Sequence, residues 1–263
     1  MRRTTSFSGS RILVVGAGGG LGQALVRELE SRGATVIAAL RDPAKAPFPA
    51  KCGTVRLDLA DADSIEEAAR SLLAVGPVDY VACAAGADVR KPIQAHSVAE
   101  IDGVLAADLR GPILLTRVFL PAMLERGWGG LLFYGGFADG RLAFPYYGAD
   151  VAARAGLRSF VESVNREIDG RGPRLTFFGP AVADTAAEKP FHDLWRMLGV
   201  EPVGAEAVAR EAADALARGE ELRVMGGFMT RFFARLNGWS PKTADALLVR
   251  RYAKALEAAF GES

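Results

Sequence analysis

The chain has 263 residues, a length typical of one α/β domain. Half of its residues are hydrophobic and 24% are charged, which excludes an intrinsically disordered chain. The 32 Lys and Arg residues nearly balance the 31 Asp and Glu residues, so the net charge of +1 does not favour a nucleic-acid-binding protein.

The two cysteines, Cys52 and Cys83, form no CxxC motif and have no neighbouring histidine. This pattern favours neither a disulfide scaffold nor a metal site, and a reducing cytoplasm is the simplest location. The first residues lead into no apolar segment of the signal-peptide type. The longest apolar candidate for a membrane span, residues 112–124, is short and contains Arg117.

The first third of the chain alternates between strand and helix patterns. The apolar run 11–15 ends in glycines and predicts a buried strand. Leu21, Ala24, Leu25 and Leu29 then follow at helical spacing, and Gly33 ends that helix. Two further strands are predicted, over 35–40 and, more weakly, over 54–57.

The alternation continues along the chain. Helices are predicted over 63–74, 97–125 and 150–168, and strands over 78–82, 130–134, 174–178 and 222–225. Strands and helices in this order predict a parallel sheet covered on both faces. We therefore expect an α/β fold, a doubly wound parallel sheet of the Rossmann type. It forms a single domain over 1–263, with a core at 10–225 and a C-terminal extension at 226–263.

The loop after the first predicted strand is rich in glycine and reads Gly16-Ala17-Gly18-Gly19-Gly20-Leu21-Gly22. A glycine turn between a buried strand and a helix lets backbone N–H groups approach a pyrophosphate at the positive end of the helix. The alternative is a tight turn that binds nothing.

The spacing of Gly16, Gly20 and Gly22 resembles that of the short-chain dehydrogenase/reductase family. Five other segments match that family in order: Asp58-Leu59, Cys83-Ala84-Ala85-Gly86, Gly130-Leu131-Leu132-Phe133-Tyr134, Arg154-Ala155-Gly156 and Gly179-Pro180 through Thr185. The resemblance covers residues 10–225. It implies a Rossmann fold, a bound nicotinamide nucleotide and a dimer or tetramer.

The resemblance also implies a set of cofactor-binding residues: Gly16, Gly18, Gly20, Leu21, Gly22, Asp58, Leu59, Ala84, Ala85, Gly86 and Arg154. An acidic residue at the end of the second strand would select NAD by bonding its ribose. The sequence has Arg41 there, which could pair with a 2′-phosphate, so NADP(H) is favoured over NAD(H). The alternative is a solvated Arg41 beside Asp42.

The residues on which the family's chemistry depends are replaced. The segment 130–156 aligns with the family pattern without a gap. Members of the family normally have Asn, Ser, Tyr and Lys at four positions, the first of which precedes this segment. These positions hold Asp108, Phe137, Asp150 and Arg154, respectively. Phe137 cannot donate a hydrogen bond, and losing one such donor costs on the order of 10²–10³ in rate. Carbonyl reduction by the family's usual mechanism is therefore not favoured.

Other side chains near these positions could handle the proton. Tyr146 and Tyr147 precede Asp150, and Tyr134 is also nearby. Asp108 lies on the apolar stripe of its helix, so burial would raise its pKa and make it a proton donor. We expect a cluster of Asp108, Asp150 and Arg154, in which Arg154 lowers the pKa of Asp150. The alternative is a structural ion pair on a helix surface.

Two segments outside this set have several interpretations. His192 lies in a stretch where the family has a substrate lid, and Phe191, Trp195 and Met197 would be its apolar contacts. The extension places aromatic residues among arginines over 226–239, and a helix follows from Pro241 through Leu256. It could be a lid for a lipid-like substrate, a contact with an anionic membrane surface, or packing against the domain or a subunit.

Three functions remain open at this point. The first is an NAD(P)(H)-dependent oxidoreductase with a non-standard active site, acting on a small or apolar carbonyl or alcohol substrate, with Asp108, Asp150, Arg154 and Tyr147 as catalytic residues. The second is a non-redox isomerase, cyclase or lyase that uses the same pocket. The third is a nucleotide-binding sensor or partner subunit without catalysis. All three rest on analogy with the family.

Overall fold

The computed structural model describes residues 6–48, 52–136, 138–226 and 228–261. Its centre is a seven-stranded sheet with the order β3-β2-β1-β4-β5-β6-β9. Every neighbouring pair is parallel. The strands are β1 (Arg11–Val15), β2 (Thr35–Leu40), β3 (Gly53–Arg56), β4 (Tyr80–Cys83), β5 (Gly130–Tyr134), β6 (Arg174–Gly179) and β9 (Leu222–Val224). The predicted doubly wound fold is thus confirmed.

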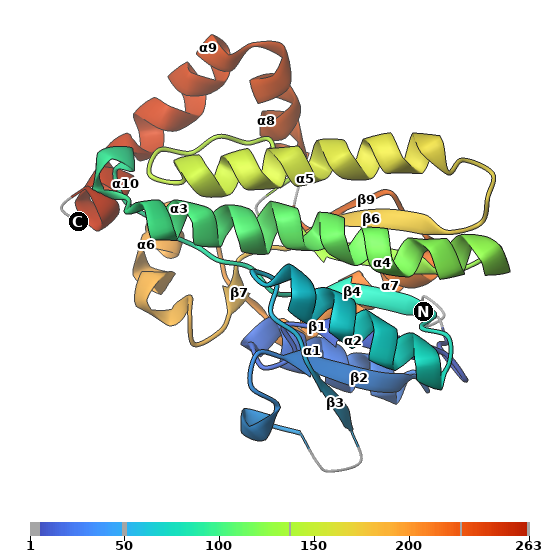
Figure 1. The fold of residues 1–263 in the computed structure, drawn as a ribbon. Helices are drawn as coiled ribbons and strands as arrows, with labels where there is room; N and C mark the ends of the chain where they lie inside the picture. The colour runs from blue at the N-terminus through green and yellow to red at the C-terminus, as the bar shows by residue number, and fades with distance from the viewer. Residues whose placement is uncertain (1–5, 49–51, 137, 227, 262–263) are drawn as a thin grey trace.

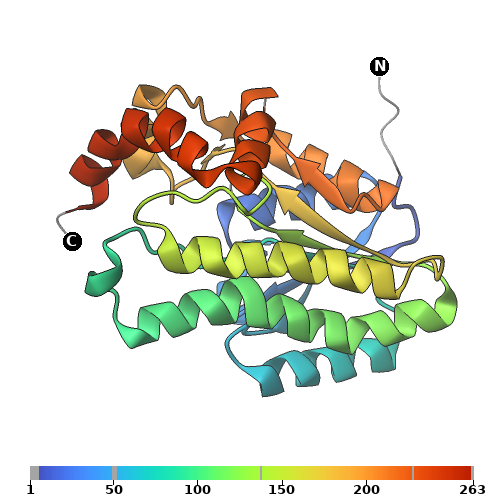
Figure 2. The same cartoon turned by 90° about the horizontal axis from the view of Figure 1, so that it is seen from above.

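Helices cover both faces of this sheet (Figures 1 and 2). On one face lie α2 (Ala62–Val75), α4 (Gly111–Arg126) and α5 (Gly148–Glu167), side by side. On the other lie α1 (Gly20–Ser31) and α7 (Ala205–Arg218). The two layers bury alternate strand residues: Ile12 and Val14 belong to the α1–α7 core, and Leu13 and Val15 to the opposite core.

The long helix predicted over 97–125 contains a local change of winding. It consists of α3 (Val98–Leu105), a π-helical turn (Ala106–Arg110) and α4. Ser97 caps its start together with Glu100. The inserted turn places Asp108 in the interior, while Leu105 is exposed. Single π-turns inside helices are frequently found at functional sites.

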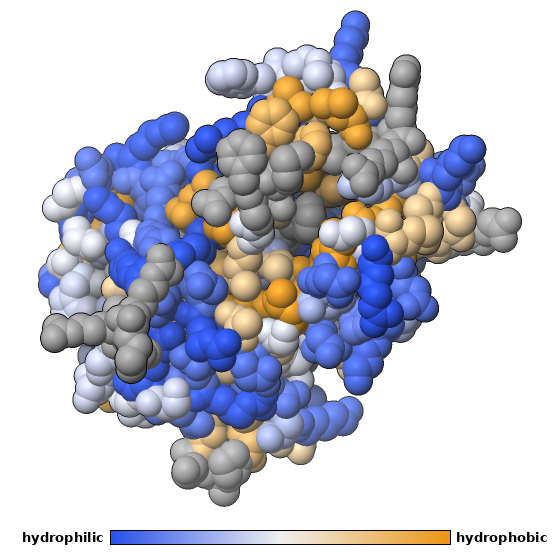
Figure 3. All heavy atoms as spheres, turned by 180° about the vertical axis from the view of Figure 1, so that it is seen from behind, coloured by the Kyte–Doolittle hydropathy of each residue, from blue (hydrophilic) through white to orange (hydrophobic). Residues whose placement is uncertain are grey.

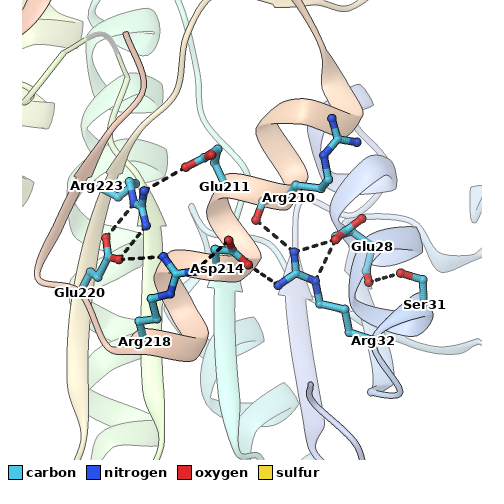
Figure 4. Close-up of polar contacts among 9 residues, drawn as sticks. All are labelled: Glu28, Ser31, Arg32, Arg210, Glu211, Asp214, Arg218, Glu220 and Arg223. Atoms are coloured by element: carbon cyan, nitrogen blue, oxygen red, sulfur yellow. Dashed lines mark hydrogen bonds and ion pairs between the residues drawn. The ribbon is translucent and has the colours of Figure 1, made fainter. Parts of the chain in front are cut away.

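The contact between α1 and α7 includes a chain of ion pairs that joins seven charged side chains (Figure 4). Arg32 is buried and reaches Glu28 at 2.7 Å and Asp214 at 2.6 Å. Asp214 also pairs with Arg218, and Arg218 pairs with Glu220. Glu220 in turn pairs with Arg223, and Arg223 pairs with Glu211. Arg32 therefore ties the two helices together with buried charge-assisted bonds.

The remaining elements gather beyond the carboxyl ends of the strands, at one end of the molecule (Figure 1). They include the two-residue strands β7 (Ala183–Asp184) and β8 (Val203–Gly204), and the helices α6 (His192–Met197), α8 (Phe228–Trp239), α9 (Pro241–Ala244) and α10 (Arg250–Phe260). A π-helical turn, Asp245–Val249, joins α9 to α10. Three short 3₁₀ turns complete the description: Pro43–Lys45, Ile93–Ala95 and Lys189–Phe191.

Two sequence-based expectations about the whole chain can be compared with the described residues. None of the helices described is long and apolar enough to cross a bilayer. Cys52 and Cys83 are both buried free thiols, and no group of metal-ligating side chains occurs in the described part of the chain.

Candidate active site

A pocket of about 870 Å³ opens at the carboxyl ends of β1, β4 and β5. This is where strand order reverses in a doubly wound sheet, and ligands bind such folds there. The pocket has the size of a ligand site and combines apolar walls with a few charged groups. Seen from behind, hydrophobic residues gather in a hollow at the centre of the surface, between hydrophilic flanks (Figure 3).

The glycine loop between β1 and α1 forms one wall of the pocket, and its close contacts require glycine. A Cβ atom on Gly16, whose φ is +77°, would lie 2.6 Å from the backbone nitrogen of Ala85. A Cβ on Gly22 would lie 2.1 Å from the Gly16 carbonyl oxygen. The loop thus packs against the segment after β4 and leaves the backbone at the start of α1 open to the pocket.

The predicted cofactor residues divide into three groups. Seven line the pocket: Gly18, Gly20, Leu21, Ala84, Ala85, Gly86 and Arg154. Gly16 and Gly22 shape the loop from behind. Asp58 and Leu59 lie outside the pocket lining. The Asp58 carboxylate accepts a hydrogen bond from the Ala60 N–H, and Leu59 packs beside Gly111.

Arg41 is exposed directly after β2 and is not part of the pocket lining. Its neighbour Asp42 caps the following turn and pairs with Lys45 at 3.3 Å. Asp42 thus has a partner other than Arg41. Arg41 directly follows Leu40, whose side chain lies against Gly18 of the glycine loop.

The structure brings Asp108, Asp150 and Arg154 together. Arg154 Nε donates to Asp150 Oδ1 at 2.7 Å, and Arg154 Nη2 lies 3.5 Å from Asp108 Oδ2. Asp108 Oδ1 accepts the backbone N–H of Ala87 at 3.1 Å. Asp108 is 4% exposed and Asp150 7% exposed, so the expected cluster is buried and is not a helix-surface ion pair.

Burial governs the protonation of these carboxyl groups. Desolvation raises the pKa of Asp108 to about 7, against the lowering effect of Arg154 and with a further rise from Asp150. Arg154 lowers the pKa of Asp150, as expected, but the net pKa of Asp150 is raised. Loss of hydration outweighs the attraction of Arg154. Burial alone would lower the pKa of Arg154, but the two carboxylates keep it above its ordinary value.

Two glycines leave space for the side chain of Arg154. Gly136 has a φ of +71°, and a Cβ there would lie 2.4 Å from Arg154 Cδ. A Cβ on Gly86 would lie 2.9 Å from Asp108 Oδ1 and 3.6 Å from Arg154 Nη2. Small residues on two different loops thus make room for the guanidinium. Phe137, predicted at the family's Ser position, lies outside the described residues.

Two of the three candidate tyrosines line the pocket. Tyr147 and Tyr134 contribute to its wall, and neither buried hydroxyl has a hydrogen-bond partner among the described residues. Burial raises the pKa of both hydroxyl groups, so each stays protonated at neutral pH. Tyr146 adopts a left-handed backbone conformation, with a φ of +71°, and does not line the pocket.

Sequence reasoning did not single out a second charged group in the pocket. Arg90, in the loop after β4, forms ion pairs with Asp88 and with Glu188 of the segment before α6. Glu188 also accepts the indole N–H of Trp195 at 2.8 Å. The guanidinium lies over the rings of Phe191 and Trp195, 4.7 Å and 5.7 Å from their centroids. Arg90 and Glu188 are 98 positions apart, so no local sequence pattern predicts their contact.

The predicted lid and the C-terminal extension meet over the pocket. Trp195 lines it, whereas Met197 is 68% exposed and takes no part. Phe233, Tyr252 and Leu256 of the extension line it as well. Leu194, Leu256 and Phe260 form a buried cluster, against which Phe144, Tyr147 and Phe191 pack. The extension therefore packs against the domain and lines one side of the pocket, which fits both its lid and its packing interpretations.

His192 begins α6 within this lid. Its Nε2 lies 3.7 Å from Asp184 Oδ1. His96 lies in the turn before α3, where its Nδ1 is 3.1 Å from the Pro92 carbonyl oxygen. Neither histidine lines the pocket.

Comparison with known proteins gives a consistent result. Residues 10–193 match the family model described as short chain dehydrogenase. The chain is 27% identical over 189 residues to the ketoacyl reductase HetN of Nostoc, covering 67% of this chain and 64% of that protein. It is 28% identical over 240 residues to the 3-oxoacyl-[acyl-carrier-protein] reductase FabG of Escherichia coli, covering 84% and 98% respectively.

A solved structure shares the fold at lower identity. A short chain dehydrogenase from Burkholderia cenocepacia in complex with NADP superimposes with a TM-score of 0.79 at 20% identity. The match covers 93% of this chain and 99% of that one.

Proposed function

Because the chain belongs to the short-chain dehydrogenase family, we propose that it transfers a hydride between NADP(H) and a small, largely apolar carbonyl or alcohol substrate. The observation that carries the proposal is the arrangement of one pocket. The glycine loop forms one wall, and Arg154 with its two carboxylates lies at the ends of β4 and β5. Nucleotide and substrate would share this space.

The residues of the pocket fit a dinucleotide. The loop at Gly18 to Gly20 presents bare backbone to the pocket, as close approach of a pyrophosphate requires. Ala84, Ala85 and Gly86 directly follow β4 and carry no side chain larger than a methyl group. Arg41 would pair with a 2′-phosphate. When bound, the nicotinamide ring would supply or accept the hydride.

The chain's own residues would control the proton. We assign the proton donor to Tyr147, because its hydroxyl is buried, protonated and unpartnered among the described residues, and its ring lines the pocket. Arg154 would orient the bound nucleotide or substrate from the end of β5. Asp108 would hold a proton near neutral pH behind Arg154, and Asp150 would fix the position of the guanidinium.

A labelling experiment tests this proposal. NADPH carrying deuterium at the transferred position is incubated with the protein and a panel of apolar ketones, and the alcohols formed are analysed by mass spectrometry. We expect deuterium in the product. We also expect a loss of roughly 10²–10⁴ in rate for Tyr147→Phe. Tyr146→Phe is the matched control, because Tyr146 is adjacent and lies outside the pocket lining.

The other outcomes point to the other functions. Turnover of a substrate without any change in the nicotinamide would favour an isomerase, cyclase or lyase. Tight nucleotide binding without turnover of any compound, together with a co-purifying partner, would favour a sensor or partner subunit. The dimer or tetramer stays a prediction, and light scattering of the purified protein checks it.

A further inference from the structure

The pocket contains more acidic than basic side chains. Three carboxylates line it, from Asp88, Asp150 and Glu188, together with two guanidiniums, from Arg90 and Arg154. Asp108 adds a fourth acid directly behind Arg154. The described pocket therefore has an excess of one negative charge when Asp108 is protonated and of two when it is ionised.

Both cations are already shared between acids. Arg90 is paired with Asp88 and Glu188, and Arg154 with Asp150 and Asp108. Lys91, the next basic residue in the loop, is directed to Glu100 at 2.7 Å. In apolar surroundings an unbalanced carboxylate attracts a cation more strongly than it does in water.

Aromatic rings stand beside these acids. Six aromatic side chains line the pocket, those of Tyr134, Phe144, Tyr147, Trp195, Phe233 and Tyr252. The rings of Tyr147, Phe191 and Trp195 already surround the guanidinium of Arg90, which shows that this part of the wall accommodates a cation. Aromatic faces next to carboxylates are the usual recognition surface for organic ammonium ions.

The wall also contains an unsatisfied polar atom. Tyr134 is 8% exposed, lines the pocket, and its hydroxyl has no partner among the described residues. A buried hydroxyl without a partner is costly. Because a hydroxyl both donates and accepts, an ammonium group would satisfy its oxygen, and a ligand acceptor would satisfy its hydrogen equally well.

We propose that the substrate of this pocket is an organic cation, with a positively charged nitrogen on an apolar frame, and that Asp88 and Glu188 select for this charge. The inference rests on the proposed function only in taking this pocket as the substrate site. It adds a charge requirement that the carbonyl or alcohol group alone does not impose. The apolar frame would contact the extension at Phe233 and Leu256.

Binding can be measured without any catalytic turnover. Phenylbutylamine, phenylbutanol and phenylbutanoate share one frame and are cationic, neutral and anionic at neutral pH. Each is titrated into the protein by calorimetry, with and without saturating NADPH. We expect the amine to bind roughly tenfold or more tightly than the alcohol, and the carboxylate to bind most weakly. Equal or tighter binding of the alcohol or the carboxylate, or no binding of the amine, overturns the proposal.

A variant pair locates the preference. Glu188→Gln removes one charge and keeps an oxygen that can accept the Trp195 indole N–H. We expect the preference for the amine over the alcohol to fall to roughly threefold or less. Asp193→Asn is the control, because Asp193 lies five residues further along the same lid and its side chain is 98% exposed. This variant should keep the full preference.

Two checks separate the possible failures. If Glu188→Gln does not fold, Asp88→Asn replaces it, since Asp88 shares the same guanidinium. An unchanged amine preference in whichever of the two variants folds contradicts the assignment of these acids. If NADPH binds and the amine preference is missing, only the cation site is wrong. If the amine binds selectively and NADPH does not bind, the proposed function is wrong and the cation site remains.

Discussion

Asp108 should make the stability of this protein depend on pH, and the substitution Asp108→Asn should remove the part of that dependence that comes from this carboxyl group. The carboxyl is 4% exposed, and desolvation raises its pKa to about 7 from an ordinary value of 3.8. The folded state therefore binds this proton more tightly than the unfolded state. The stability from the bound proton is fully present below the unfolded pKa and is lost as the pH rises through about 7.

The size of the effect follows from these two pKa values. Between pH 5 and pH 8 the folded protein should lose about 3 kcal/mol of unfolding free energy through Asp108 alone. Asp150, whose pKa is also raised, adds a change of the same sign. The informative quantity is therefore the difference between wild type and Asp108→Asn, since the amide stays neutral throughout this range.

Urea unfolding at pH 5, 6, 7 and 8 measures this difference. We expect Asp108→Asn to gain on the wild type by about 3 kcal/mol between the two ends of the series. Asp169→Asn is the control, because Asp169 is 78% exposed yet also lies 2.7 Å from an arginine. It should leave the wild-type pH profile unchanged. Parallel profiles for wild type and Asp108→Asn would refute the reasoning.

Three other substitutions test separate parts of the account. Gly136→Ala should lower the free energy of unfolding, measured by thermal unfolding, by at least about 2 kcal/mol, because a Cβ would meet Arg154. Gly170→Ala should lower it by only about 1 kcal/mol, because Gly170 has a similar φ of +73° but open space around it. Arg41→Ala should reduce the ratio of NADPH to NADH affinity roughly tenfold or more, and an unchanged ratio would show that Arg41 does not contact the 2′-phosphate. Arg32→Ala should destabilise the fold by about 3 kcal/mol, since it leaves buried acids unpaired, while Arg196→Ala on the surface should change stability by less than about 0.5 kcal/mol. Equal losses for Arg32→Ala and Arg196→Ala would mean that the network contributes no stability.

The sheet could be predicted from sequence because each of its strands carries a local signal. The run 11–15 is apolar and ends in glycine, and the strand formed is Arg11–Val15. Helix α7 was missed although its sequence has a buried alanine stripe and ends at Gly219. The long helix was predicted without its π-turn, because a one-residue change in hydrogen bonding leaves the apolar periodicity nearly intact.

The site was predictable only where its residues lie close together in sequence. Asp150 and Arg154 are one helical turn apart, so their contact follows from helix geometry. The pairing of Asp108 with Arg154 required the register of the family pattern. The pair Arg90–Glu188 joins two loops whose meeting depends on the tertiary fold. The sign of the Asp150 shift depended on burial, which a helical spacing does not report.

The most direct measurement of the central claim is a calorimetric titration of the protein with NADPH and then with NADH, repeated on Gly20→Val. The account predicts NADPH binding on the order of micromolar, weaker binding of NADH, and loss of both in the variant. The loss is expected because Gly20 lines the pocket at the glycine loop, where a valine side chain would take the space needed by a pyrophosphate. Failure of both nucleotides to bind the wild-type protein would contradict the account, and the glycine loop would then be only a turn.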